Sequence, residues 1–215
     1  MKALRFVTMS LGLLATPVVA YGQACMGAPV GGGQYGIEGG MGMGEGFKSY
    51  TGGVNANLNG PLAFNGGVSV TKPDAGGDNI TTFGANGGYE LTQSSRLSAC
   101  PTVGVSYSSF STDFLGTTVD INQIVVPVGV GLGTTLPAGR MNVTLFAVPQ
   151  FLWFRTSGDV GGETQSDTQN EFGLNTGLRL GMSSVYAGAG MSMNSIEDSD
   201  PVFNFGVGLV LGGRR

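Results

Sequence analysis

Residues 121–154 read INQIVVPVGVGLGTTL, PAGR and MNVTLFAVPQFLWF. Nearly every second residue is apolar over 124–132 and again over 141–153. A two-residue period is the pattern of a β-strand with two different faces. Residues 137–140 contain a proline and a glycine, which indicates a tight reversal of the chain. The stretch therefore predicts a long hairpin with one apolar face.

The chain of 215 residues opens with a targeting segment. A basic start, an apolar run over 6–20 and the small residues after it are the pattern of a secretory signal peptide covering 1–24. Cleavage after Ala20, Gly22 or Ala24 satisfies the small-residue rule equally well. The mature chain is therefore expected to be exported.

Composition excludes several classes of function. Without the leader the chain has eight basic and fourteen acidic residues, so it lacks the clustered positive charge that nucleic-acid binding needs. The absence of histidine removes Ser–His and Cys–His nucleophilic pairs and the commonest metal ligand. No apolar run after the leader reaches the roughly 18 residues of a membrane-spanning helix. We expect no enzyme activity, no cofactor, no metal site and no nucleic-acid partner.

The two-residue period recurs along the mature chain and predicts ten strands. They cover about 34–43, 48–58, 62–71, 81–91, 97–110, 121–136, 141–154, 169–180, 185–194 and 202–211. From the second strand onward, short connections alternate with longer ones, and the longer ones are 72–80, 111–120, 156–168 and 195–201. In an up-and-down meander this places the short turns at one end and the long loops, with most of the acidic residues, at the other.

An even number of alternating strands with short turns at one end is typical of outer-membrane barrels. A closed ring of strands pairs every backbone group, as a chain in lipid must. The predicted fold class is all-β, an up-and-down antiparallel transmembrane β-barrel of about ten strands, with eight as the alternative. Residues 25–33 would form a periplasmic tail and residues 34–215 the barrel. In the competing interpretation, a soluble sandwich, a second sheet covers the apolar face.

The barrel assignment sorts the candidate site residues by face. The predicted lumen is lined by small and polar residues, and its charges are Glu38, Glu90, Glu171 and Arg179. An aromatic girdle is expected at Phe151, Trp153 and Phe154.

The cysteines are treated separately. Cys25 and Cys100 are an even pair in an exported chain, which favours a disulfide that straps the tail to the periplasmic mouth. Free thiols, or lipidation of Cys25 after cleavage at Ala24, are the alternatives.

The last predicted strand, FNFGVGLVL over 203–211, resembles the C-terminal strand of bacterial outer-membrane barrels. The mature chain resembles, in pattern, the small porin-like barrels of outer-membrane protein A or W type. The resemblance implies an outer-membrane location and recognition by the barrel-assembly machinery. Barrel enzymes of this kind use an essential histidine, which this chain lacks.

From these features we expect a monomer with a structural or surface role, or a narrow passive pore for small solutes. Its acidic loops are expected to meet lipopolysaccharide. The alternative is a secreted, soluble, glycine-rich β-protein with an adhesive or matrix role.

Overall fold

The computed structural model describes residues 34–58, 61–75, 77–91, 97–114, 117–160, 163–182, 184–196 and 199–211. These residues form ten strands and no helix. The strands are β1 (Gln34–Gly44), β2 (Phe47–Asn57), β3 (Leu62–Pro73), β4 (Ile80–Tyr89), β5 (Ser98–Phe114), β6 (Thr117–Ala138), β7 (Met141–Val160), β8 (Glu163–Met182), β9 (Val185–Asn194) and β10 (Val202–Leu211). The predicted signal peptide and periplasmic tail lie outside the described residues.

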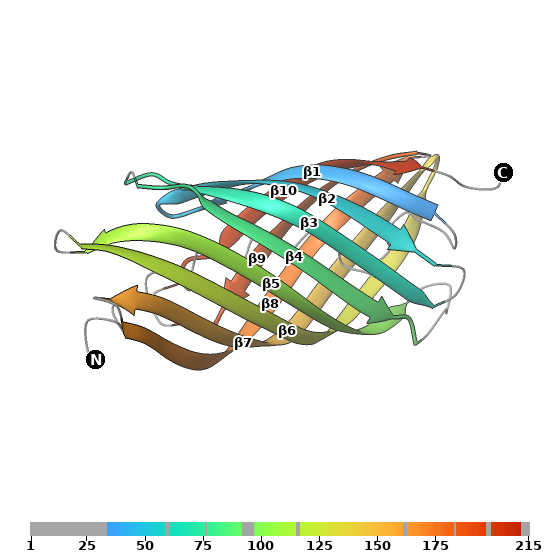
Figure 1. Ribbon diagram of the computed structural model, residues 1–215. Coiled ribbons are helices and arrows are strands. Elements are labelled where there is room, and N and C mark those ends of the chain that lie inside the picture. Colours follow the sequence, from blue (N-terminus) through green and yellow to red (C-terminus); the bar gives the residue numbers. More distant parts are fainter. Residues whose placement is uncertain are drawn as a thin grey trace.

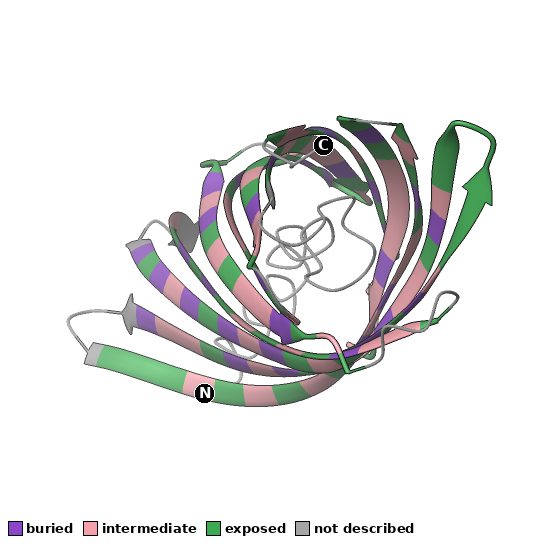
Figure 2. Cartoon of the chain, turned by 90° about the vertical axis from the view of Figure 1, so that its right-hand side faces the viewer, coloured by how far each residue is buried: buried purple, intermediate pink, exposed green. Residues whose placement is uncertain are grey.

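The strands form one closed barrel (Figure 1). Each strand pairs antiparallel with its neighbours in the chain, and β1 pairs antiparallel with β10 to close the ring. Figure 2 shows the closed ring end-on. The predicted ten-stranded up-and-down barrel is confirmed. The eight-strand alternative and the sandwich are wrong, because all ten strands belong to one sheet.

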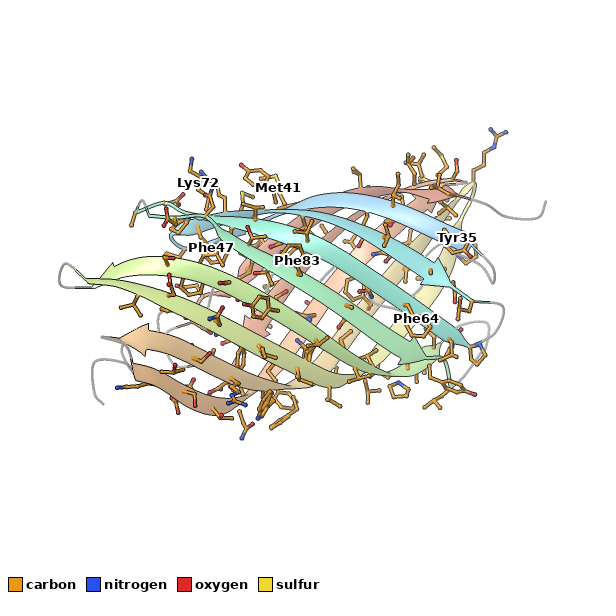
Figure 3. All side chains as sticks on the ribbon, viewed as in Figure 1. Tyr35, Met41, Phe47, Phe64, Lys72 and Phe83 are labelled. Carbon is orange, nitrogen blue, oxygen red and sulfur yellow. The ribbon has the colours of Figure 1, made fainter. Side chains whose placement is uncertain are left out.

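The two faces of the sheet are as different as the sequence predicts, and burial alternates along the strands in Figure 2. The predicted apolar rows lie on the outside, where exposed members include Tyr35, Val54, Phe64, Phe83, Val105, Leu178 and Phe205; Figure 3 labels three of these side chains. Buried polar residues of the opposite face include Ser49, Asn55, Thr82, Ser106, Asn175 and Asn204. An apolar exterior around a closed ring of paired strands is the arrangement that a lipid environment requires.

Among the described residues, no helix has both the length and the apolar character needed to cross a membrane.

The central hairpin turns at Gly139, whose φ of 67° is a left-handed conformation that glycine adopts without strain. Pro127 and Pro149 each interrupt one ladder, because proline has no N–H to donate. The β5–β6 pairing skips from Val103↔Val128 to Ser106↔Val125, and the β6–β7 pairing skips from Gly129↔Gln150 to Leu132↔Ala147. The register is the same on both sides of each gap. Pairing is therefore weakened near these two prolines.

Strands β5 to β8 are longer than predicted, at 17, 22, 20 and 20 residues. The predicted loops 111–120 and 156–168 are wrong, because most of these residues continue the paired strands β5–β8. Residues 164–170 (TQSDTQN) are polar throughout. They therefore lack the apolar alternation on which the strand prediction depended.

Candidate functional site

The interior face brings together two of the four predicted charges, Glu38 of β1 and Arg179 of β8. The Arg179 Nη2 atom lies 3.9 Å from Glu38 Oε2, and both side chains are more than nine-tenths buried. Two strands, β9 and β10, lie between β8 and β1 in the ring. The pair therefore reaches across the junction at which the first and last strands close the barrel.

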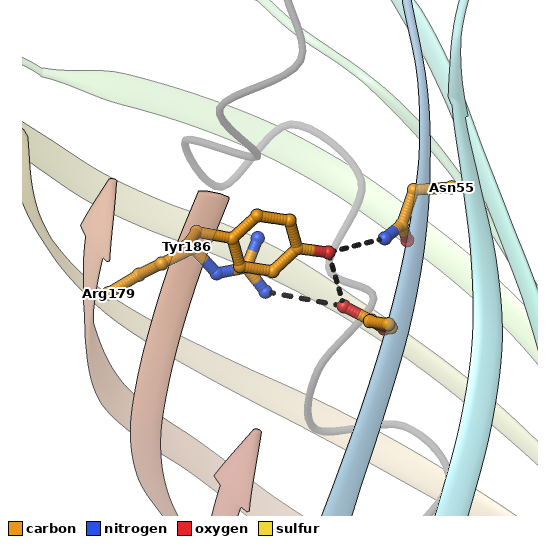
Figure 4. A network of polar contacts seen from close by, with 4 residues as sticks. Asn55, Arg179 and Tyr186 are labelled. Carbon is orange, nitrogen blue, oxygen red and sulfur yellow. Dashed lines mark hydrogen bonds and ion pairs between the residues drawn. The ribbon is translucent and has the colours of Figure 1, made fainter. Parts of the chain in front are cut away.

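Tyr186 of β9 completes this group (Figure 4). Its hydroxyl donates to Glu38 Oε2 at 2.9 Å and accepts from Asn55 Nδ2 at 3.2 Å. The Arg179 Cζ atom lies 4.7 Å from the centre of the Tyr186 ring, within the range of a cation–π interaction. We call Glu38, Asn55, Arg179 and Tyr186 the closure cluster, since it links β8 and β9 to β1 and β2.

Glycines make room for the closure cluster. Tyr186 and Glu38 are both register partners of Gly208, on opposite sides of β10. A Cβ atom at Gly208 would overlap the Tyr186 ring. The ring therefore lies along the wall over β10. A cavity of about 10 Å³ beside it, lined by closure-cluster residues, Thr51 and glycines, is of the size that holds one water molecule.

The wall formed by β2, β3 and β4 is lined by small hydroxyl side chains. The hydroxyls of Ser49, Ser69, Thr71 and Thr82 are buried and have no hydrogen-bond partner in the protein. Buried polar groups are normally satisfied by protein or by water. Four such groups lie on neighbouring strands and make this part of the inner wall polar, although the hydroxyls themselves are closed to solvent.

The other two predicted charges do not join the closure cluster. Glu90 follows β4 near the short-turn end, where its backbone N–H donates to the Pro61 carbonyl at 2.8 Å. Glu171 of β8 accepts a hydrogen bond from the Ser195 hydroxyl at 2.6 Å. This bond holds the start of the β9–β10 connection against β8.

The predicted aromatic girdle is corrected at one position. Phe151 is exposed and Trp153 is half-buried, and their odd-numbered positions share the outer side of β7. Phe154 is only 4% exposed and packs inside with Val125, Leu152 and Ile196. Consecutive residues of a strand point to opposite faces, so Phe154 cannot belong to the same belt as Trp153.

Cys100 is fully buried, whereas Cys25 lies outside the described residues. The disulfide between them stays a prediction. Among the described residues, no group of three or more acidic or cysteine side chains is placed to hold a metal ion.

Sequence reasoning missed Tyr186 as a site residue. The sequence did contain a signal for it. Tyr186 occupies an inward-facing position of β9, and glycines occupy the neighbouring inward-facing positions 188, 206 and 208. A large side chain among inward glycines indicates that the side chain lies over them.

At one end of the barrel the exterior changes from apolar to polar. Outward residues up to Tyr107, Ile124, Trp153 and Phe172 belong to the apolar rows, and the next outward positions are Ser109, Asn122, Arg155 and Asn170. The Tyr107 hydroxyl donates to Asn122 Oδ1 at 2.7 Å across this boundary. We call the parts of β5–β8 beyond the boundary the projecting sheet: residues 109–114, 117–122, 155–160 and 163–171.

The same end contains a carboxyl pair outside the apolar belt. A side-chain hydrogen bond to Asp200 raises the pKa of Glu45 in the β1–β2 turn, and the Asp200 charge and slight desolvation raise it further. The two carboxyls therefore compete for one proton across the β1–β2 and β9–β10 connections.

The closed ring, the apolar exterior and the polar interior together decide the architecture. The fold is that of an outer-membrane-type barrel. No protein-family model and no curated protein matches the sequence.

Solved structures with a similar fold include three bacterial barrels. The first is the translocator domain of the autotransporter NalP from Neisseria meningitidis (13% identity, 97% of this chain and 96% of that chain, TM-score 0.48). The second is Ail, the attachment invasion locus protein of Yersinia pestis (14% identity, 84% and 100%, TM-score 0.42). The third is the N-terminal β-barrel domain of Pseudomonas aeruginosa OprF (12% identity, 84% and 99%, TM-score 0.39).

Proposed function

We propose that the protein is a bacterial outer-membrane barrel with a surface role, in which the barrel anchors the projecting sheet outside the cell. The observation that carries this proposal is the continuation of β5–β8 past the apolar exterior into a region with polar outward residues. Lipid cannot cover that region without desolvating its polar side chains. The short turns, the start of β1 and the end of β10 lie at the opposite end, on the right of Figure 1, which is the periplasmic end by the rule for such barrels.

Cysteine labelling on intact cells tests the location and the orientation together. Ser166→Cys on β8 is expected to react with a membrane-impermeant maleimide, and Arg140→Cys in the β6–β7 turn is expected to react only after lysis. The unsubstituted chain is the control for any labelling of Cys25 and Cys100 themselves. Equal labelling of both variants before lysis, or labelling of Arg140→Cys alone, contradicts the proposal.

Two partners follow from this location. The barrel-assembly machinery would insert the chain, and lipopolysaccharide would surround the acidic outer end. Divalent ions shared between carboxylates and lipid phosphates would support the second contact. Chelation is therefore expected to weaken lipopolysaccharide binding by the purified protein.

A narrow passive pore is the second candidate function. It is favoured by the polar inner wall of β2–β4 and by the inward glycines over which Tyr186 lies along the wall, because glycines add no side-chain volume to the interior. A ten-stranded barrel is narrow, so any conductance is expected to be small. Planar-bilayer recordings of the purified protein test this function, and a silent bilayer would favour the surface role alone.

A further inference from the structure

We infer that β8 of the projecting sheet is a docking edge for a basic, extended peptide that adds as a strand antiparallel to it. This inference rests on the proposed surface role and names the partner of that surface.

The edge arises because β8 is longer than β9. Their pairing ends at Gly173↔Asn194, and one further contact follows, in which the Ser195 N–H donates to the Phe172 carbonyl at 2.8 Å. After Ser195 the chain turns away. Over residues 165–170, β8 pairs with β7 on one side and with no described strand on the other.

Backbone alternation shows which groups this edge presents. The Phe172 N–H and carbonyl both face the β9 side, since they bond to Ser195. In an antiparallel ladder every second residue faces the same neighbour. The N–H and carbonyl groups of Asn170, Thr168 and Ser166 therefore face the open side. Six residues at about 3.4 Å each give an edge of about 20 Å.

In the described part of the chain, this edge has no proline, lysine or bulge to block strand addition, and its charged residues are all acidic. Natural edges are protected by lysine, proline, bulges or covering segments. Residues 163–171 (ETQSDTQNE) contain no lysine, arginine, proline or glycine. A peptide in this position would continue the line of β9 and would run antiparallel to β8, as β9 does.

Charge selects a basic partner. The projecting sheet contains six acidic residues and a single basic residue, Arg155; the acidic residues are Asp113, Asp120, Asp159, Glu163, Asp167 and Glu171. Asp167 lies on the edge strand, where its Oδ1 atom accepts from the Thr168 N–H at 3.0 Å and its Oδ2 atom accepts from Gln169 Nε2 at 3.3 Å. A lysine or arginine opposite Asp167 would attract this carboxylate and release the Thr168 N–H for a peptide carbonyl.

A second copy of the chain fits the edge less well. It would bring an equally acidic sheet against this one. Two copies in one membrane also point the same way, so their β8 strands would run parallel, whereas this position continues an antiparallel ladder.

The test uses the full-length mature protein in detergent micelles and a fluorescent eight-residue peptide of alternating lysine and threonine with blocked ends. Binding is measured by fluorescence anisotropy. Ser166→Pro removes one N–H from the open side and is compatible with an edge strand. Ser166→Ala is the matched control, because it removes the hydroxyl and keeps the N–H. Heat-modifiable gel mobility checks that both variants are folded.

Ser166→Pro is expected to weaken binding about tenfold, which corresponds to roughly one hydrogen bond, while Ser166→Ala stays within about twofold of the parent. A peptide in which glutamate replaces lysine is expected not to bind. Equal affinity of the Pro and Ala variants, equal binding of the glutamate peptide, or no binding by the parent overturns the inference. Because Ser166→Cys labelling is independent of the peptide, failure here with normal surface labelling leaves the proposed location intact.

Discussion

At the scale of single residues, the Tyr186 hydroxyl is the centre of the closure cluster. It donates to Glu38 and accepts from Asn55, so Tyr186→Phe removes two hydrogen bonds and leaves a buried carboxylate short of one donor. We expect this change to lower the free energy of unfolding by about 1–3 kcal/mol. Urea-induced unfolding in detergent measures it.

Tyr35→Phe is the matched control for Tyr186→Phe. Tyr35 lies on the outer face and is 59% exposed. Its change is expected to stay within about 0.5 kcal/mol. Equal effects of the two variants would contradict the structural role of the closure cluster.

A substitution at Gly208 tests the packing of the same cluster. Gly208→Ala places a methyl group into the Tyr186 ring, which must move, and overpacking of this kind costs about 1–3 kcal/mol. At Gly52 no atom lies within 4 Å of an added Cβ, so Gly52→Ala is the control. The temperature of the heat-modifiable gel transition is expected to fall for Gly208→Ala and to change little for Gly52→Ala. If Gly52→Ala lowered this transition temperature as much as Gly208→Ala does, the result would argue against close packing at Gly208.

The carboxyl pair at the outer end gives a pH-dependent prediction. The pKa of Glu45 is raised by its contact with Asp200, so the folded state binds this proton more tightly than the unfolded chain. The associated stabilisation is present at low pH and is lost as the pH rises through the raised pKa. Asp200→Asn removes the competing charge, and the pKa of Glu45 is expected to fall in an NMR titration. An unchanged pKa would show that the two side chains do not interact in solution.

At the scale of strands, sequence reasoning succeeded where one face is apolar. The bounds of β9 and β10 coincide with the predicted 185–194 and 202–211, because apolar residues occupy every second position in both. It failed in the projecting sheet, where the outward residues are polar and residues 164–170 of β8 have no apolar alternation. Two β-branched residues on one face, Thr164 and Thr168, were the remaining sign of a strand in β8.

In the projecting sheet, we expect the rate of amide hydrogen exchange to alternate from residue to residue along β8. The amide protons of Asp167 and Gln169 face β7 and are expected to exchange slowly. Those of Ser166 and Asn170 face the open side and are expected to exchange quickly. Amide-resolved exchange by NMR in micelles measures the difference, and uniform protection along 165–170 would show that another segment covers this edge.

At the scale of the whole molecule, the alternation of residues along each strand assigned Glu38 and Arg179 to the interior face. It could not show that the two side chains are in contact. Their contact depends on ring closure, which makes β1 a neighbour of β10 and brings residues 141 positions apart in the sequence to 3.9 Å. Closure is a property of all ten registers together. No local pattern in the sequence contains it, and the partners of Tyr186 on β1 and β2 depend on it too.

The predicted bond between Cys25 and Cys100 would add a covalent link to that closed ring. Cys100 begins β5 near the short-turn end, which is also where β1 begins, so a tail before β1 is on the correct side to reach it. The bacterial periplasm is oxidising, and a bond closing a loop of this length would contribute about 4 kcal/mol. Denatured mature protein is expected to take up no alkylating reagent before reduction and two equivalents afterwards, as measured by intact mass. Alkylation of Cys100 before reduction contradicts the bond, and Cys100→Ser, which leaves Cys25 reactive without a reductant, is the control that identifies the partner.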